Sequence, residues 1–378
     1  MRVIVVGAGL IGVCSAYFAA KSGHEVVVYD RGDVGTSTTA ASGSSVLQQT
    51  KRSPILLELT QESMSLYTEL AADLDVPYRM HGSHVLFETN EEEAFVQERA
   101  AWLRQHNVQV ELLGRREITM AIPEVGSGVI GSCYAPSDAE VVPFAACIAV
   151  AQGAVRLGVQ IVTRMPVSGL DITAGKVRGV LTPAGLHQCD QVIIATGPWM
   201  PNLLRPLGIE IPITPQKGEL LHSEPISPRL RGRILSVRYL MSKFQAISSD
   251  GFSAGMVVGQ EPDGSIKMGS TRESAGFNVE TTSRARQAIL GEVKRYLPSL
   301  ASLTIDHQTA GLRPYSVLKR PVVCRMQEPE GLVLAGGHGG DGVALAPVTG
   351  WMVARLLDGK ATRWDGPLGF AHAAETPS

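Results

Sequence analysis

The first thirty residues carry the pattern that most restricts how this chain can fold. A short β-branched run at residues 2–6 leads into the glycine turn Gly7-x-Gly9-x-x-Gly12, and apolar residues at helical spacing follow. A second β-branched run then occupies residues 25–29. Strand, turn, helix and strand in this order predict a βαβ unit whose two strands pair in parallel.

Each glycine of this turn has a separate physical task. Gly7 permits the tight turn, Gly9 lets backbone amides approach a pyrophosphate, and Gly12 lets the helix pack closely on the strand. Asp30 ends the second strand, where a carboxylate can accept hydrogen bonds from an adenosine ribose. The motif therefore predicts a Rossmann-type dinucleotide site, although by itself it does not distinguish FAD from NAD. The residues expected to contact the dinucleotide here are Gly7, Ala8, Gly9, Leu10, Ile11, Gly12, Asp30 and Arg31.

Length and composition limit the remaining classes of protein. A chain of 378 residues is long enough for two domains, and its 44% apolar and 19% charged residues are typical of a globular protein. A net charge of -2 gives no reason to expect nucleic acid or an acidic membrane as a partner. The apolar stretch at residues 141–151 is about half the roughly 20 residues that cross a bilayer, so no membrane span is expected.

The cysteines and histidines give no metal or disulfide pattern. The five cysteines are scattered and form no Cys-x-x-Cys pair, which argues against disulfide frameworks and zinc and favours a reducing cytoplasm. The N-terminus begins a structural motif by Val3, so no secretion signal is expected. His81 and His84 flank a glycine before a strand and are assigned no role.

Hydrophobic periodicity predicts the other elements of an α/β chain. Helices are expected at residues 55–74, 92–105, 141–157, 282–297 and 343–357, and strands at 159–163, 177–181, 191–195, 212–223 and 332–335. Residues 238–270 alternate in the manner of an antiparallel sheet. Because the dinucleotide segments come from the beginning, middle and end of the chain, discontinuous domains are expected. Residues 1–80, 141–212 and 305–378 form the predicted dinucleotide-binding domain, and residues 81–140 and 213–304 an α+β substrate domain on a mixed or antiparallel sheet.

Later segments identify the dinucleotide through a family resemblance. They are residues 36–43 (TSTTAASG), Val167, residues 195–199 (ATGPW), residues 311–314 (GLRP) and residues 336–347 (GGHGGDGVALAP). With the first turn, they resemble the FAD-dependent amino-acid oxidoreductases, the family of D-amino-acid oxidase, glycine oxidase and sarcosine oxidase. The resemblance covers nearly the whole chain and implies a bound FAD.

The resemblance also implies which residues meet the flavin. The glycine-rich loop would bring backbone amides to the ribityl chain and pyrimidine edge of FAD. The helix from Val343 would direct its positive N-terminal dipole at the flavin and favour its reduction. His338 either touches flavin or substrate or shapes the loop. The further predicted FAD contacts are Thr38, Thr39, Ala40, Ser42, Gly43, Val167, Ala195, Thr196, Gly197, Trp199, Arg313, Gly337, His338, Gly340, Asp341, Gly342, Val343 and Ala344.

Arg313 resembles the arginine that in this family grips the substrate carboxylate by a two-point salt bridge. The competing interpretation is an arginine tied to structural carboxylates. Tyr239 and Tyr315 are expected in the same pocket, with core packing as their alternative. Hydride transfer from the substrate Cα to flavin N5 needs mainly orientation, which agrees with the absence of a Ser, His, Asp constellation.

The chain departs from the family pattern after residues 311–314. The family continues with an Asp-Gly turn, whereas this chain has YSVLKRP at residues 315–321. Cys324 lies beyond the place where monomeric sarcosine oxidases attach their flavin, so non-covalent FAD is expected.

Two further segments, residues 221–225 (LHSEP) and 239–244 (YLMSKF), are similar to β subunits of heteromeric sarcosine oxidase, opine dehydrogenase and hydroxyproline dehydrogenase. This resemblance implies a partner subunit with its own redox cofactors. Lys319 and Arg320 would then face that partner or a second flavin, or they are simply solvated charges.

Three functions remain open from the sequence. The first is a flavin dehydrogenase or oxidase acting on a D-amino acid, N-substituted glycine, opine or cyclic imino acid such as hydroxyproline. The second is an NAD-linked dehydrogenase, in which the C-terminal glycine loop would have no purpose. The third is a non-catalytic or electron-relaying flavin subunit, against which Arg313 argues.

Overall fold

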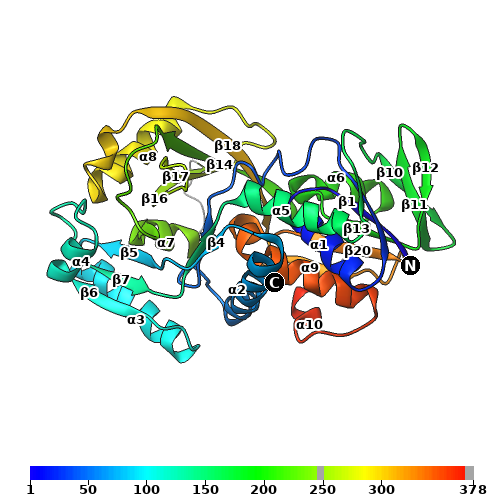
Figure 1. Cartoon of the computed structure of the whole chain (residues 1–378), viewed down its shortest axis with the longest axis horizontal. Helices are drawn as coiled ribbons and strands as arrows, with labels where there is room; N and C mark the ends of the chain where they lie inside the picture. Colours follow the sequence, from blue (N-terminus) through cyan, green and yellow to red (C-terminus); the bar gives the residue numbers. More distant parts are fainter. Residues whose placement is uncertain (245–250, 371–378) are drawn as a thin grey trace.

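Two large sheets organise the chain, which the computed structural model describes for residues 1–244 and 251–370. Figure 1 shows a six-stranded sheet with its helices on the side of the N-terminus, and a larger sheet beyond it on the other side. The fold is therefore a mixed α/β fold with sheets of different orientation, as the sequence predicted. The two sheets are described in turn because the functional site lies between them.

The six-stranded sheet has the order β19-β20-β13-β1-β2-β9. Its strands pair in parallel except for β19, which is antiparallel to β20. The β-branched runs are buried on both faces, which is typical of a parallel sheet. The expected βαβ unit is thus confirmed. The strands are β1 (Arg2–Val6), β2 (Glu25–Tyr29), β9 (Gln160–Val162), β13 (Gln191–Ile194), β19 (Val322–Arg325) and β20 (Leu332–Gly336).

Four helices cover one face of this sheet and share one hydrophobic core. They are α1 (Leu10–Lys21), α2 (Pro54–Leu74), α5 (Pro143–Arg156) and α9 (Gly342–Leu357). Helices α1 and α9 approach closely, because a Cβ added to Gly350 would lie 2.5 Å from the backbone of Cys14. Pro347 interrupts the hydrogen bonding of α9, and the Tyr67 hydroxyl instead donates to the Val343 carbonyl at 2.6 Å. This bond lets a proline remain within the first turns of the helix.

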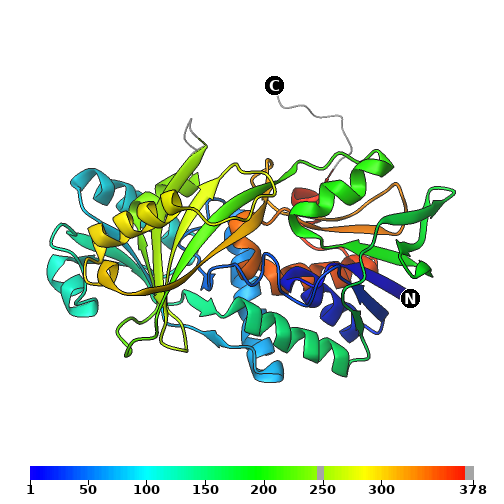
Figure 2. The same cartoon turned by 90° about the horizontal axis from the view of Figure 1, so that it is seen from above.

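The larger sheet has eight strands in the order β18-β14-β17-β16-β15-β5-β7-β6 (Figure 2). Its strands pair antiparallel apart from β15 and β5, so the sheet is mixed. The strands are β5 (Ser83–Phe87), β6 (Glu111–Gly114), β7 (Gly131–Ala135), β14 (Ile213–Ser223), β15 (Arg233–Ser236), β16 (Phe252–Gln260), β17 (Ile266–Glu273) and β18 (Ile305–Ser316). The helices that follow or precede them are α3 (Asn90–Gln105), α4 (Arg115–Ala121), α7 (Val237–Phe244) and α8 (Ser283–Tyr296).

One expected strand region is a helix. The alternation at residues 238–270 predicted an antiparallel sheet throughout, whereas residues 237–244 form α7 and only β16 and β17 are strands. The prediction was wrong at this end because Val237, Leu240 and Phe244 recur at spacings of three and four, which places them on one face of a helix. Residues 245–250, also within the predicted sheet, lie outside the described residues.

Small elements complete the described fold. Strands β10, β11 and β12 form a three-stranded sheet over the other face of the six-stranded sheet, and β3, β8 and β4 form a second small sheet. The bounds are β3 (Ser45–Val46), β4 (Tyr78–Arg79), β8 (Ala139–Val141), β10 (Gly169–Thr173), β11 (Lys176–Thr182), β12 (Gly185–Gln188), α6 (Met200–Leu204) and α10 (Asp365–Leu368). Within the described ranges, no helix is both long and apolar enough to cross a membrane.

The two sheets are joined by β18. We propose the domain division drawn from the sequence, since the six-stranded sheet takes its strands from residues 1–80, 141–212 and 305–378. Strand β18 falls within the last of these segments but pairs with β14 of the larger sheet from Ile213 to Ser223. It therefore carries the chain from one sheet to the other. The proposed boundary near residue 305 assigns the paired strands β14 and β18 to different domains.

Candidate active site

A cavity of about 630 Å³ lies between the two sheets and collects most of the predicted site. Its walls come from the turn after β1, the loop at residues 35–45, β14, β17, β18 and the loop before α9. The predicted residues that line it are Gly7, Gly9, Leu10, Ile11, Asp30, Arg31, Thr38, Thr39, Ser42, Gly43, Val167, Ala195, Thr196, Gly197, Trp199, Tyr239, Arg313, Tyr315, Gly337, His338, Gly340, Asp341, Gly342 and Val343. Segments far apart in sequence thus meet at one site.

Four predicted residues stand behind the cavity wall. A Cβ added to Gly12 would lie 1.8 Å from the Gly7 carbonyl oxygen, so this glycine is required for packing of the turn. Ala8 and Ala344 are buried in the core, and Ala40 is exposed. These four shape the site from outside rather than by lining it.

The turn after β1 is stabilised by two side chains. The Asp30 carboxylate accepts hydrogen bonds from the backbone amides of Ala8 at 2.6 Å and Gly32 at 2.8 Å. The Thr39 hydroxyl accepts from the Leu10 amide at 3.1 Å. The N-cap residue Gly9 has no side chain of its own, so it leaves the space before the first turn of α1 open. The positive end of α1 therefore faces the cavity, as a diphosphate requires.

An aromatic wall stands near this end of the cavity. The Arg31 guanidinium lies 3.9 Å from the ring centroid of Trp199, and both residues line the cavity. Trp199 stacks in turn on Phe277 at 5.7 Å between ring centroids. The segment at residues 36–43 is formed mostly of consecutive turns, and the Thr38 hydroxyl donates to the Leu312 carbonyl at 2.9 Å. That bond attaches the segment to β18.

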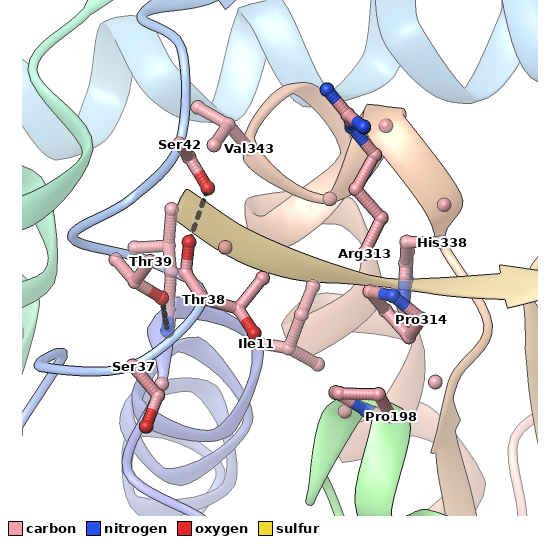
Figure 3. A pocket seen from close by; sticks show the side chains of 18 of the residues that line it. Ile11, Ser37, Thr38, Thr39, Ser42, Pro198, Arg313, Pro314, His338 and Val343 are labelled. Atoms are coloured by element: carbon pink, nitrogen blue, oxygen red, sulfur yellow. Dashed lines mark hydrogen bonds between the residues drawn. The ribbon is translucent and has the colours of Figure 1, made fainter. Parts of the chain in front are cut away.

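The loop before α9 closes the opposite side of the cavity. In Figure 3 Thr38, Thr39 and Ser42 stand on one side, and Arg313, Pro314 and His338 on the other. His338 shares a hydrogen bond of 2.8 Å between Nε2 and the Thr349 hydroxyl, and burial lowers its pKa to about 4. The imidazole is therefore neutral at pH 7. Helix α9 begins at Gly342, so its N-terminal dipole points into the cavity as predicted.

Asp341 lies between two lysines that the sequence did not single out. Its Oδ1 is 2.5 Å from Lys51 Nζ and 2.8 Å from Lys243 Nζ. Burial would raise the pKa of the Asp341 carboxyl, but Lys243 and Lys51 outweigh it and hold the pKa well below its ordinary value. Burial lowers the pKa of Lys51, which Asp341 partly restores. No spacing in the sequence connects these three residues, because each comes from a different element.

Arg313 extends from β18 across the neighbouring strand β14. Its Nη1 donates to the Thr271 carbonyl at 2.9 Å and to the Lys217 carbonyl at 3.4 Å. This path exists because Gly218 has no side chain, since an added Cβ would lie 2.1 Å from Nη1. Burial and the neighbouring Arg272 lower the pKa of Arg313 to about 10, so it stays charged at pH 7.

No carboxylate of the described residues forms an ion pair with Arg313. This favours the interpretation of Arg313 as a ligand-binding residue over that of a structural arginine. Tyr239 lies beside it, with the Arg272 guanidinium 5.0 Å from its ring centroid. Burial would raise the pKa of Tyr239, but Arg272, Lys243 and Arg313 together lower it. The phenol therefore faces a strongly positive part of the cavity.

The remaining singled-out residues lie at its margin or away from it. Lys319 and Arg320 line the cavity near Arg52, whose Nη2 donates to the Lys319 carbonyl at 2.5 Å. His84 belongs to β5 of the larger sheet and His81 precedes that strand, and neither lines the cavity. Cys324 is buried in the core of the six-stranded sheet. Within the described residues no cysteine lines the cavity and none forms a disulfide.

The cavity walls fit a long polar cofactor. The buried Thr196 hydroxyl, Ser316 hydroxyl and His338 Nδ1 have no hydrogen-bond partner among the described residues. All three residues line the cavity, where a bound molecule would supply partners. One glycine corner, one helix N-terminus and one glycine-rich loop line this single cavity, as the two phosphates and the flavin of FAD require. Such a fold and site define a flavin-dependent oxidoreductase.

The comparison with known families agrees. The sequence pattern of the family described as FAD dependent oxidoreductase matches residues 2–356, and the chain belongs to this family. Membership confirms FAD as the cofactor and the resemblance drawn from the motifs. It also removes the NAD-linked alternative.

Curated relatives and solved structures are similar over almost the whole chain. The chain is 29% identical to glycine oxidase of Pseudomonas putida, covering 95% of this chain and 94% of the relative. It is 27% identical to glycine oxidase of Bacillus licheniformis, covering 96% and 94%. The structure of glycine oxidase from Bacillus cereus superposes with a TM-score of 0.86 at 25% identity, covering 96% of both chains. The protein is accordingly an FAD-dependent amine oxidase or dehydrogenase.

Proposed function

We propose that this enzyme oxidises the C–N bond beside the carboxylate of an amino or imino acid. The substrate class comprises D-amino acids, N-substituted glycines, opines and hydroxyprolines. One observation carries the proposal: the buried, charged guanidinium of Arg313 reaches the cavity without a carboxylate partner among the described residues. The glycine oxidases among its relatives support the same substrate chemistry.

Residues of the two glycine segments would hold FAD without a covalent bond. Gly7, Gly9 and the N-terminus of α1 would hold the diphosphate, and Asp30 would hold the adenosine ribose. Gly337, Gly340 and the N-terminus of α9 would hold the flavin. Bound FAD supplies the electron acceptor, so that hydride leaves the substrate Cα for flavin N5 and water hydrolyses the resulting imine.

The chain's own residues would orient the substrate rather than move protons. Arg313 binds the carboxylate through its planar fork and thereby fixes the position of Cα. Tyr239 and Tyr315 would wall the pocket on either side of the substrate. His338 is neutral at pH 7 because burial lowers its pKa to about 4, so it adds no further charge near the flavin. An amine that arrives neutral needs no general base.

An anaerobic titration tests the proposal. The purified holoenzyme is mixed with D-amino acids, sarcosine, opines and hydroxyprolines, and the visible flavin absorbance is followed. We expect at least one of these amines to bleach the flavin while the corresponding amine without a carboxylate does not. Reduction by carboxylate-free amines alone would contradict the role given to Arg313.

The electron acceptor is part of the same proposal. Lys319 and Arg320 lie at the cavity margin, where a partner subunit or second cofactor would receive electrons. We also propose that the protein is located in the cytoplasm, in agreement with its five cysteines, which form no disulfide. Oxygen consumption by the purified chain, compared with reduction of an artificial dye, distinguishes an oxidase from a partner-dependent dehydrogenase. Subunits that copurify with the chain identify such a partner directly.

A further inference from the structure

We propose that Arg272 is a second anion-binding residue of the substrate pocket, so that the preferred substrate carries two acidic groups. The inference rests on the proposed function and narrows its substrate class. Three observations support it. Arg272 lies beside Arg313, the nearby carboxylates already form ion pairs with lysines, and positive charge is in excess among the described residues at this end of the cavity.

The two arginines are neighbours because of strand order. Arg313 lies on β18 and Arg272 on β17, with β14 between them. Arg313 crosses β14 above Gly218 and donates to the carbonyl of Thr271, the residue directly before Arg272. Both arginines line the cavity, and Arg272 contributes to the lowered pKa of Arg313. The guanidinium groups therefore act on the same ligand space.

The Arg272 guanidinium has N–H donors that remain available for a ligand. Its Nη1 donates to the Ser242 hydroxyl at 2.8 Å, and its guanidinium lies over the Tyr239 ring. An arginine has five N–H donors, so one hydroxyl uses only part of its capacity. In the described part of the chain, no carboxylate forms an ion pair with Arg272. The ring and the hydroxyl hold the side chain in place while leaving its charge unneutralised.

The nearest acidic residues are occupied elsewhere. Glu273 follows Arg272 but lies 3.4 Å from Lys217 Nζ, which also pairs with buried Glu219 at 3.1 Å. Asp341 is shared by two lysines. These three carboxylates thus lie beside lysines, and none of them forms an ion pair with Arg272.

The charges of the described residues at this end of the cavity do not balance. Among these residues, Lys51 and Lys243 share the carboxylate of Asp341, and Arg272 and Arg313 form no ion pair with a carboxylate. A substrate with one carboxylate would neutralise Arg313 and leave Arg272 without a counter-charge in a partly dehydrated pocket. A second acidic group, on the amino-acid side chain or on the amine substituent, would neutralise it. The geometry thus fits an acidic D-amino acid or an N-carboxyalkyl amino acid.

Matched substrate pairs test this inference by turnover. The pairs are D-alanine against D-aspartate, and sarcosine against iminodiacetate, which differ by one carboxylate. We expect the diacid of a pair to have the higher kcat/KM. The substitution Arg272→Met should lower kcat/KM for the diacid about 10- to 100-fold, mainly through KM, and change that of the monoacid less than about threefold. The matched control is Arg286→Met, which changes an exposed arginine of α8 and should alter kcat/KM for neither substrate.

Binding without turnover separates the two proposals. Malonate and succinate are compared with acetate and propionate as ligands of the oxidised holoenzyme, read from perturbation of the flavin spectrum. We expect the dicarboxylates to bind at least tenfold more tightly and this preference to disappear in Arg272→Met. Equal affinities would overturn the inference even if monocarboxylate amines reduce the flavin. An Arg272-dependent preference without reduction by any amine would instead overturn the proposed function and leave the anion site standing.

Discussion

The two ends of the cavity are built in opposite ways. The glycine end, formed by Gly7, Gly9, Gly12 and Thr39, consists of backbone groups and small side chains. The cationic end consists of the charged side chains of Arg272, Arg313, Lys243 and Asp341, which line the cavity, and of buried Lys51, which pairs with Asp341. The first end comes mainly from one short stretch of chain, whereas the second needs five separate segments to meet.

This difference teaches how each end tolerates change. At Gly7 and Gly12 the backbone itself occupies the space, so an added methyl group collides with main-chain atoms. At the cationic end the side chains balance one another, so removal of one charge leaves another buried and unpaired. Substitutions should therefore act through shape at one end and through charge at the other.

The largest effect is expected for Gly12→Val. The new Cβ would lie 1.8 Å from the Gly7 oxygen and force the turn apart, so the variant should lose bound FAD. The ratio of flavin to protein absorbance measures this loss. Gly291→Ala is the control, because nothing lies within 4 Å of its added Cβ in α8, and it should retain FAD with stability changed by at most about 1 kcal/mol. A fully flavinated Gly12→Val protein would show that the glycine end is not limited by shape.

Asp341→Asn should give the next largest effect. It leaves Lys51 and Lys243 without their shared carboxylate, and loss of one partner from a buried ion pair costs about 3 to 5 kcal/mol. The measurement is thermal or urea unfolding of the holoenzyme. Asp33→Asn removes an exposed ion pair with Arg164 and should leave the unfolding transition almost unchanged. If both variants unfold alike, the cationic end does not depend on charge balance.

Arg313→Ala is expected to affect the substrate rather than the fold. A hydrogen bond to a charged group contributes about 1.5 to 3 kcal/mol, so the apparent KM should rise by about one to two orders of magnitude. Flavin content should stay unchanged, because the glycine end is intact. Arg313→Lys keeps the charge without the planar fork and should recover only part of the affinity. Unchanged kinetics in Arg313→Ala would remove this residue from the substrate site.

The smallest effect concerns pH. The neighbouring cations outweigh burial and lower the pKa of Tyr239 from its usual 10, so the phenol ionises at a lower pH than free tyrosine. Its negative charge would then compete with a bound carboxylate. Propionate, which has no amine to titrate, should bind less tightly as pH rises into this range, by less than about tenfold. Tyr239→Phe should flatten this part of the profile, and an identical profile in both proteins would mean that Tyr239 does not titrate there.

Much of the fold could be predicted because its signals are local. Each signal is contained within one short stretch of sequence. The examples are each β-branched run of the six-stranded sheet, the turn Gly7-x-Gly9-x-x-Gly12, and the apolar spacing within α2 and within α9. The helix α7 was missed because its eight residues were read together with the alternating strands that follow, although its apolar residues recur at helical spacing. Packing against β15 and β16 selected the helix.

The cationic end could be predicted only where a motif marked it. Arg313 belongs to the GLRP segment and was found from the sequence. Lys51 and Arg272 stand in no recognisable motif, and Lys243 belongs to the YLMSKF segment, which gave it no role in the site. A lysine after a run of polar residues is usually solvated, and nothing nearby indicates that Lys51 is buried against Asp341. Its position follows from the approach of the loop before α2 to the start of α9.

The sequence by itself determined that two glycine corners hold a dinucleotide, because backbone conformation and helix dipoles depend on residues within a few positions of each other. Only the tertiary structure decided which charges face the substrate, because strand order places Arg272 and Arg313 across one strand and brings two lysines to one carboxylate. Electrostatic interaction depends on distance in space, and that distance exists only after the two sheets have packed together.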